Sequence, residues 1–178
     1  MINFGKWVVK HKIAILVIGI LLLIPSALGY FKTRINYDIL TYLPKDIETM
    51  KGQEILVDEF GTGAFSMCVV EGMSDKDISK MRKEMEKVPN VKAVLWYDSL
   101  VDLSIPKELL PDEITEIFLN KDTDSTILFV LFPTSISSDE TMNAIGDLRK
   151  VVGKQCYLSG MSAVITDTKN LSDKETPI

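Results

Sequence analysis

Few residues of the chain have the chemistry that catalysis or metal binding requires. The single histidine among 178 residues, His11, lies at the edge of a long apolar run, and the two cysteines, Cys68 and Cys156, are far apart. A zinc site needs several His or Cys ligands at short spacing. A Ser-His-Asp or Cys-His relay would have to use His11 as its base. These counts exclude most metal and nucleophilic chemistry.

Paired carboxylates are the remaining candidates for general acid–base work. Asp58–Glu59 and Asp112–Glu113 are such pairs, but both lie among other solvated charges on predicted helices and have no supporting residues. The chain also has no glycine loop of the kind that cradles phosphate. We therefore predict no catalytic residue, no metal site and no cofactor, and we do not expect an enzyme.

The distribution of charge argues against nucleic acid as a partner. Residues 1–34 contain five Lys or Arg and no acid, which leaves 15 basic and 25 acidic residues downstream. The distal part therefore has a net charge of −10, which repels phosphate backbones. No basic stripe interleaved with aromatic residues is present.

Residues 13–31 are uncharged and apolar enough to cross a membrane. As a helix these 19 residues would extend about 28 Å, close to the thickness of the hydrocarbon layer. A cleaved signal peptide is the alternative, because a basic start and an apolar stretch precede the small residues Ala27 and Gly29. Either interpretation places residues 32 onward outside the cytosol.

Hydrophobic periodicity and capping residues predict the elements of the distal part. An extended stretch with alternating Ile35, Tyr37 and Ile39 comes first, and Asp46 is the predicted cap of the helix that follows. Capping boxes at Ser74 and Ser137 predict two further helix starts. The predicted helices are 47–60, 74–88, 137–152 and 161–175, and the predicted strands are 64–71, 91–97, 126–132 and 155–159.

From residue 64 the predicted order is strand, helix, strand, excursion, strand, helix, strand. This is the β-α-β-β-α-β pattern of the ferredoxin-like fold, so the predicted fold class is α+β. Right-handed crossovers would place the first strand between the third and the fourth. Cys68 and Cys156 would then lie on neighbouring antiparallel strands, which permits a disulfide without requiring one; two buried free thiols are the simpler interpretation.

Two of the strands are apolar without alternation. Residues 127–132 are six apolar residues in succession and residues 67–70 are four. Since an antiparallel sheet with helices on one face normally alternates, both faces are expected to be covered. Either helix 47–60 or the excursion 98–123 folds under the sheet, or a partner covers that face.

The order of several short segments resembles one family of membrane proteins. The segments are FGKWVVKHK, INYDILTYLPKD, GQEILVDEFG, SIPKELLPDEITEIF and YLSGMSAVITDTKNLSDKETP. Together with the apolar run, they resemble the amino-terminal portion of a resistance-nodulation-division (RND) superfamily transporter, of its MMPL-like branch. The resemblance extends over nearly the whole chain and favours a retained membrane helix over a signal peptide.

The resemblance implies a domain plan. Residues 1–12 form a cytoplasmic amino terminus, 13–31 a transmembrane helix and 32–63 a connector strand and helix. Residues 64–160 form the ferredoxin-like porter subdomain, outside the cytoplasmic membrane. Residues 161–178 lead toward a second membrane helix that the chain lacks, so it is expected to be a fragment that does not transport alone.

The resemblance also implies a function and partners. The intact protein would be a proton-driven exporter of hydrophobic or lipid-like molecules. The partners would be the lipid bilayer, the remaining transporter helices, and a second porter repeat or other protomers. Trp96 and Phe118 are the candidate residues of the substrate path, although core packing is the commoner use of such residues. A stand-alone anchored or secreted interaction module is the alternative function.

Overall fold

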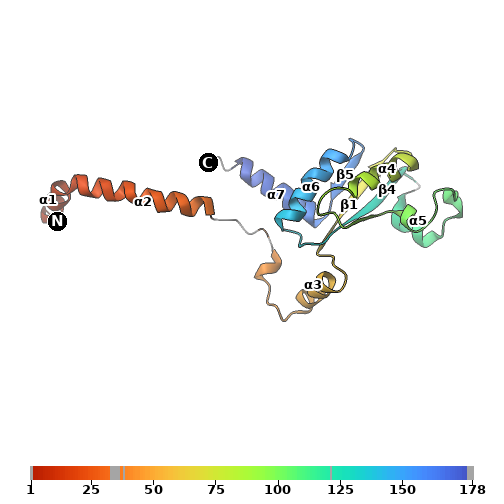
Figure 1. Cartoon of the computed structure of the whole chain (residues 1–178), viewed down its shortest axis with the longest axis horizontal. Helices are drawn as coiled ribbons and strands as arrows, with labels where there is room; N and C mark the ends of the chain where they lie inside the picture. The colour runs from red at the N-terminus through yellow and green to blue at the C-terminus, as the bar shows by residue number, and fades with distance from the viewer. Residues whose placement is uncertain (1, 33–36, 38, 121, 176–178) are drawn as a thin grey trace. The chain divides into compact units, whose positions relative to one another are not determined.

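The computed structural model describes residues 2–32, 37, 39–120 and 122–175 of the chain. It divides the chain into two compact units, residues 1–36 and 37–178 (Figure 1).

The amino-terminal unit consists of two helices, α1 (Ile2–Lys10) and α2 (Lys12–Lys32). Among the described helices, α2 is the one with the length and composition to cross a membrane, over Lys12–Tyr30. Its charged residues, Lys12 and Lys32, lie at its two ends, and Pro25 is inside it. The predicted helix over 13–31 is therefore confirmed as a helix. The sequence analysis did not predict α1 as a separate element.

The second unit is an α+β domain built on an antiparallel sheet, so the predicted α+β class is confirmed. The strands are β1 (Ala64–Glu71), β2 (Ala93–Leu95), β3 (Leu119–Asn120), β4 (Ser125–Phe132) and β5 (Cys156–Ser159). Their order is β2-β4-β1-β5, and β3 pairs with the end of β4. The first strand thus lies between the third and fourth main strands, as predicted.

Helices cover one face of this sheet. They are α4 (Asp75–Met85) and α6 (Asp139–Val151), with α7 (Met161–Glu175) packed beside α6 (Figure 1). The core between helices and sheet is apolar; its most buried members include Met85, Val94, Leu128, Val130, Phe132, Ile145 and Leu148. Such burial, at about 25 cal/mol per Å² of apolar surface, is the main source of stability for a domain of this size.

Serine side chains begin the two covering helices. The Ser74 hydroxyl oxygen accepts a hydrogen bond from the Asp77 amide, so the predicted cap at Ser74 is confirmed. The Asp77 carboxylate accepts from the Ser74 hydroxyl, where a capping box would use the Ser74 backbone N–H. In α6 the cap is Ser138, whose hydroxyl accepts from the Thr141 amide, and the prediction of Ser137 was wrong by one residue. Two consecutive serines offer the same chemistry, and their backbone geometry decides between them.

The connector differs from its prediction. Ile39–Tyr42 is a short 3₁₀ helix (η1), so the extended interpretation is wrong there. Ile35 and the rest of 33–36 lie outside the described residues. Helix α3 (Glu48–Asp58) confirms the predicted helix, but its cap position is Ile47 without a side-chain hydrogen bond, and Asp46 does not cap it. Gly61, with φ 57°, follows its end.

The excursion after β2 contains short helical segments. β2 is shorter than predicted because Tyr97–Ser99 forms a 3₁₀ turn (η2); η3 (Lys107–Leu109) and α5 (Asp112–Phe118) follow. Side-chain hydrogen bonds tie the two ends of the excursion to the sheet. The Trp96 indole N–H donates to the Thr126 hydroxyl at 2.8 Å, and that hydroxyl donates to the Phe118 carbonyl at 2.6 Å.

A buried ion pair joins α4 to the start of the excursion. Arg82 Nε lies 2.9 Å from Asp98 Oδ1, and the Ser79 hydroxyl donates to Asp98 Oδ2 at 2.8 Å. Arg82 also donates to Glu86 and to the Val94 carbonyl. Because both charged groups are largely withdrawn from water, loss of one partner would leave an uncompensated charge.

The two faces of β4 allow a matched test of the packing. We predict that Leu128→Ala, on the helix side and fully buried, lowers the free energy of unfolding by about 3 kcal/mol. Leu131→Ala, on the opposite face of the same strand, is predicted to cost about 1 kcal/mol or less. Urea unfolding of the full chain in detergent measures both values. Equal losses would contradict the assignment of the two faces.

Candidate functional site

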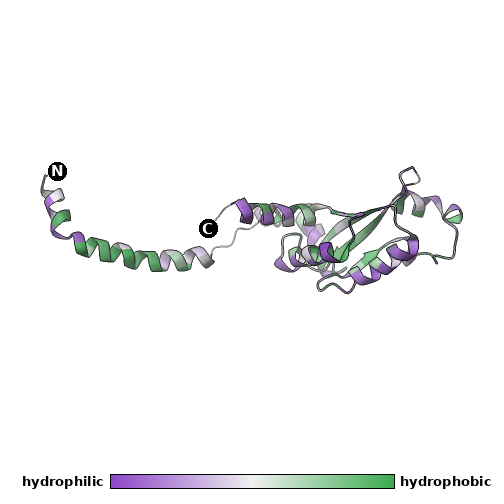
Figure 2. Ribbon diagram, turned by 90° about the horizontal axis from the view of Figure 1, so that it is seen from above, coloured by the Kyte–Doolittle hydropathy of each residue, from purple (hydrophilic) through white to green (hydrophobic). Residues whose placement is uncertain are grey.

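The main candidate site is the face of the sheet opposite the helices. Its side chains alternate with those of the core along each strand, and the register brings them side by side: Phe65 opposes Leu131 and Met67 opposes Phe129. We call this surface the open face; it consists of Phe65, Met67 and Val69 from β1, Ile127, Phe129 and Leu131 from β4, Leu95 from β2 and Tyr157 from β5. The strands are coloured mainly as hydrophobic in Figure 2.

Much of this apolar surface is in contact with solvent. Phe65 is 54% exposed, Leu95 40% and Tyr157 56%, while the side chains at the centre are half-buried. Contiguous apolar surface of this kind is uncommon on monomeric proteins and usually marks an interface. The sequence predicted that both faces of β1 and β4 are covered. In the structure the helices cover one face, and the other face is only partly covered.

The excursion covers one corner of the open face. Phe118 of α5 packs edge-on against Phe129, with ring centroids 5.9 Å apart. A cavity of about 540 Å³ is lined by Glu116 and Ile117 of the excursion and by Val69 and Ile127 of the open face. Helix α3 has no buried residue and does not close the surface. The prediction that a segment folds under the sheet thus holds for one corner, and the remainder stays available to a partner.

The two candidate residues of the substrate path lie inside the domain. Trp96 has no exposed surface and Phe118 is 7% exposed. The Trp96 indole and the Phe118 carbonyl both hydrogen-bond to the Thr126 hydroxyl, so both residues hold the excursion against the sheet. The structure assigns them to packing, and contact with a substrate stays a prediction.

The two cysteines lie on neighbouring strands, both with free thiols. Cys68 pairs with Leu158, two residues from Cys156, so the thiols occupy diagonal positions on the helix side of the sheet. A hydrogen bond with the Cys68 thiol lowers the pKa of Cys156 to about 7, although burial opposes this. The same hydrogen bond and burial raise the pKa of Cys68. The free thiols agree with the interpretation that the sequence favoured, although Cys156 is only partly buried.

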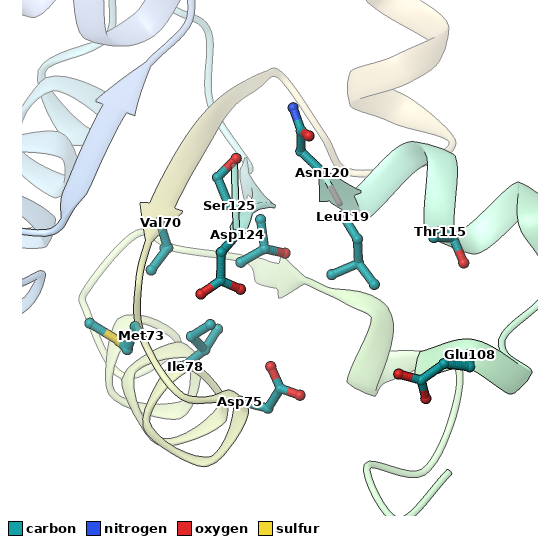
Figure 3. Close-up of a pocket in the computed structure, with 11 residues that line it drawn as sticks. Val70, Met73, Asp75, Ile78, Glu108, Thr115, Leu119, Asn120, Asp124 and Ser125 are labelled. Carbon is teal, nitrogen blue, oxygen red and sulfur yellow. The ribbon is translucent and has the colours of Figure 1, made fainter. Parts of the chain in front are cut away.

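A second cavity of about 390 Å³ lies on the helix side of the sheet, between α4 and the excursion (Figure 3). Val70, Met73, Ile78 and Leu119 contribute its apolar surface, and carboxylates of Asp75, Glu108 and Asp124 point into it. Burial and a hydrogen bond to Asp75 raise the pKa of the neighbouring Tyr97. The sequence analysis did not foresee this cavity, because it depends on how the excursion packs.

Within residues 2–32, 37, 39–120 and 122–175, no group of three His, Cys, Asp or Glu side chains is placed to hold a metal ion. His11 is in the amino-terminal unit, where its Nδ1 lies 2.9 Å from the Trp7 carbonyl oxygen. The carboxylates of Asp58 and Glu59 lie on or beside the exposed helix α3.

Comparison with known proteins does not assign the chain to a family. No family model matches it, and no curated protein matches it at a significant level.

The cysteine pair provides a test by chemical reactivity. We predict that alkylation of Cys156 by iodoacetamide rises with pH and reaches half of its maximum near pH 7, because the thiolate accepts a hydrogen bond from Cys68. In Cys68→Ala the donor is lost, and the midpoint is expected to move toward the ordinary value of about 8.5. Mass spectrometry of the alkylated peptide measures both midpoints. An unchanged midpoint would show that the hydrogen bond does not activate Cys156.

Proposed function

We propose that this chain forms a membrane-anchored porter subdomain of an RND-superfamily transporter of the MMPL-like type, which exports hydrophobic or lipid-like molecules. The observation that supports the proposal most strongly is the open face, an uncovered apolar sheet surface on a domain that follows a membrane-length helix. The sequence segments quoted above support it independently.

The strand order supports a ferredoxin-like porter subdomain. β1 and β4 are the central antiparallel strands, with β5 and β2 outside them, and α4 and α6 connect the strands over one face. A β-α-β-β-α-β unit with right-handed crossovers gives this order. Such a unit covers one side of its sheet and needs another layer to bury the other.

The proposed partner is a second porter-type subdomain, from another part of the transporter or from another protomer. Its sheet or helices would pack on the open face and remove Phe65, Leu95 and Tyr157 from water. A specific interface buries about 800 Å² on each partner, at about 25 cal/mol per Å² of apolar area. An apolar interface of this kind lets a rigid domain move with its neighbours, as the opening and closing of a substrate path requires.

The proposal gives α2 the role of an anchor in the cytoplasmic membrane, with its amino terminus in the cytoplasm and the sheet domain outside. Residues 13–31 contain no ionisable side chain except the phenol of Tyr30. Proton coupling in membrane transporters depends on ionisable residues within the membrane. In this proposal the coupling therefore belongs to other helices of the transporter, and the chain supplies no catalytic residue or cofactor.

The orientation of the anchor has a direct test. We predict that Lys154→Cys, in the exposed loop before β5, reacts with a membrane-impermeant maleimide in intact cells. Lys6→Cys, in α1, should react only after the membrane is permeabilised. The unmodified chain serves as the blank for Cys68 and Cys156. Labelling of Lys6→Cys in intact cells would contradict the proposed orientation.

The partner of the open face is tested by photo-crosslinking in the membrane of the producing cell. Benzoylphenylalanine is placed at Tyr157 on the open face and, as a control, at Leu171 on α7; the native side chains are 56% and 55% exposed. We predict that Tyr157 alone forms an adduct, and that the captured peptide belongs to a multi-helix membrane protein with a second strand-helix-strand module.

Other adducts separate the alternatives. An adduct at Tyr157 with a protein that has no membrane helix would support the stand-alone interaction module instead. Absence of an adduct at Tyr157, or equal adducts at Tyr157 and Leu171, would show that the open face is not a specific interface.

A further inference from the structure

The first helix of the chain is amphipathic. Trp7 and Val8 follow Phe4 by three and four residues, so these three side chains share one face of α1, and His11, directly after the helix, follows Trp7 by four residues. Lys6 and Lys10 lie four residues apart on the opposite face. Residues 2–12 contain no acidic side chain.

The aromatic side chains of this face are exposed and ordered against one another. Phe4 is 72% exposed and Trp7 54% exposed. The ring of Trp7 lies 6.4 Å from that of Phe4 and 4.8 Å from that of His11. Tryptophan prefers the boundary between headgroups and acyl chains, because its ring is apolar and its N–H is polar.

The helix is continuous with the candidate membrane span but does not share its axis. α1 ends at Lys10, His11 forms a turn, and α2 begins at Lys12. The Ile15 amide donates to the His11 carbonyl, which joins the two helices through this turn. In Figures 1 and 2 α1 bends away from the line of α2. A helix that bends away at the end of a membrane span is placed to lie along the membrane surface.

We propose that α1 binds the surface of an anionic lipid leaflet. Phe4, Trp7 and Val8 enter the boundary of headgroups and acyl chains, and Lys6, Lys10 and Lys12 interact with lipid phosphates. Two observations select lipid as the occupant: the basic charge of the helix complements anionic headgroups, and α1 adjoins a helix of membrane length. The inference rests on the proposed membrane insertion of α2, and the experiment below tests the two separately.

Trp7 provides the probe. The full chain is reconstituted into vesicles of phosphatidylcholine with and without phosphatidylglycerol, and the fluorescence of Trp7 is obtained as the difference from Trp7→Phe. The other tryptophan, Trp96, is fully buried and remains in both proteins. With phosphatidylglycerol, we expect Trp7 emission to shift to the blue, to be quenched by brominated lipid, and to be protected from acrylamide.

Charge variants test the role of the lysines. In Lys6→Gln/Lys10→Gln the preference for phosphatidylglycerol vesicles, measured by brominated-lipid quenching, is expected to fall about tenfold or more. The control Lys45→Gln/Lys51→Gln removes the same charge from exposed positions outside α1 and should change nothing. Equal effects of the two double variants would overturn the role of α1 in recognising the anionic surface.

Extraction at alkaline pH separates this inference from the proposed function. If the chain resists extraction but acrylamide still quenches Trp7 fully, α2 is inserted and the inference on α1 is wrong. If the chain is extracted while Trp7 was protected before the wash, α1 binds lipid and the anchor is wrong. If the chain is extracted and Trp7 is never protected, both are wrong.

Discussion

The pairing of β1 with β4 is the interaction on which the structure depends. Eight residue pairs join the two strands from Ala64–Phe132 to Glu71–Ser125, and both strands are mainly apolar on each face. Because side chains alternate along a strand, this single register places one apolar set under α4 and α6 and the other on the open face. A shift by one residue would exchange the sets, so the core and the candidate interface are determined together.

The proposed function places this two-sided sheet in a larger assembly. Helices α4 and α6 cover one face of the sheet, and the excursion covers one corner of the opposite face. Most of the open face stays exposed. At the other end of the chain, α2 has the composition of a membrane anchor and α1 that of a surface helix. In the proposed transporter, a partner subdomain anchored in the same membrane would be held at high effective concentration near the open face, which favours burial of that face.

Much of the fold could be predicted from sequence because local signals agreed with the tertiary structure. Helix α7 has the predicted bounds, and Ser74 caps α4 through the predicted pair with Asp77. The failures have physical causes: Ser138 competes with the identical Ser137, and β2 stops early because Tyr97–Ser99 forms a 3₁₀ turn. The cover of α5 on Phe129, the cavity near Asp75 and the Arg82–Asp98 pair depend on contacts distant in sequence, which no local pattern reveals.

The two faces of β4 meet different surroundings, the helices on one side and solvent on the other. Methyl relaxation by a water-soluble gadolinium complex measures this directly in the full chain held in a lipid nanodisc. The structure predicts strong relaxation of the Ile127 and Leu131 methyl groups and little relaxation of Leu128 and Val130, which have no exposed surface. Equal protection of all four residues would show that the open face is already covered within this chain, and the account would fail.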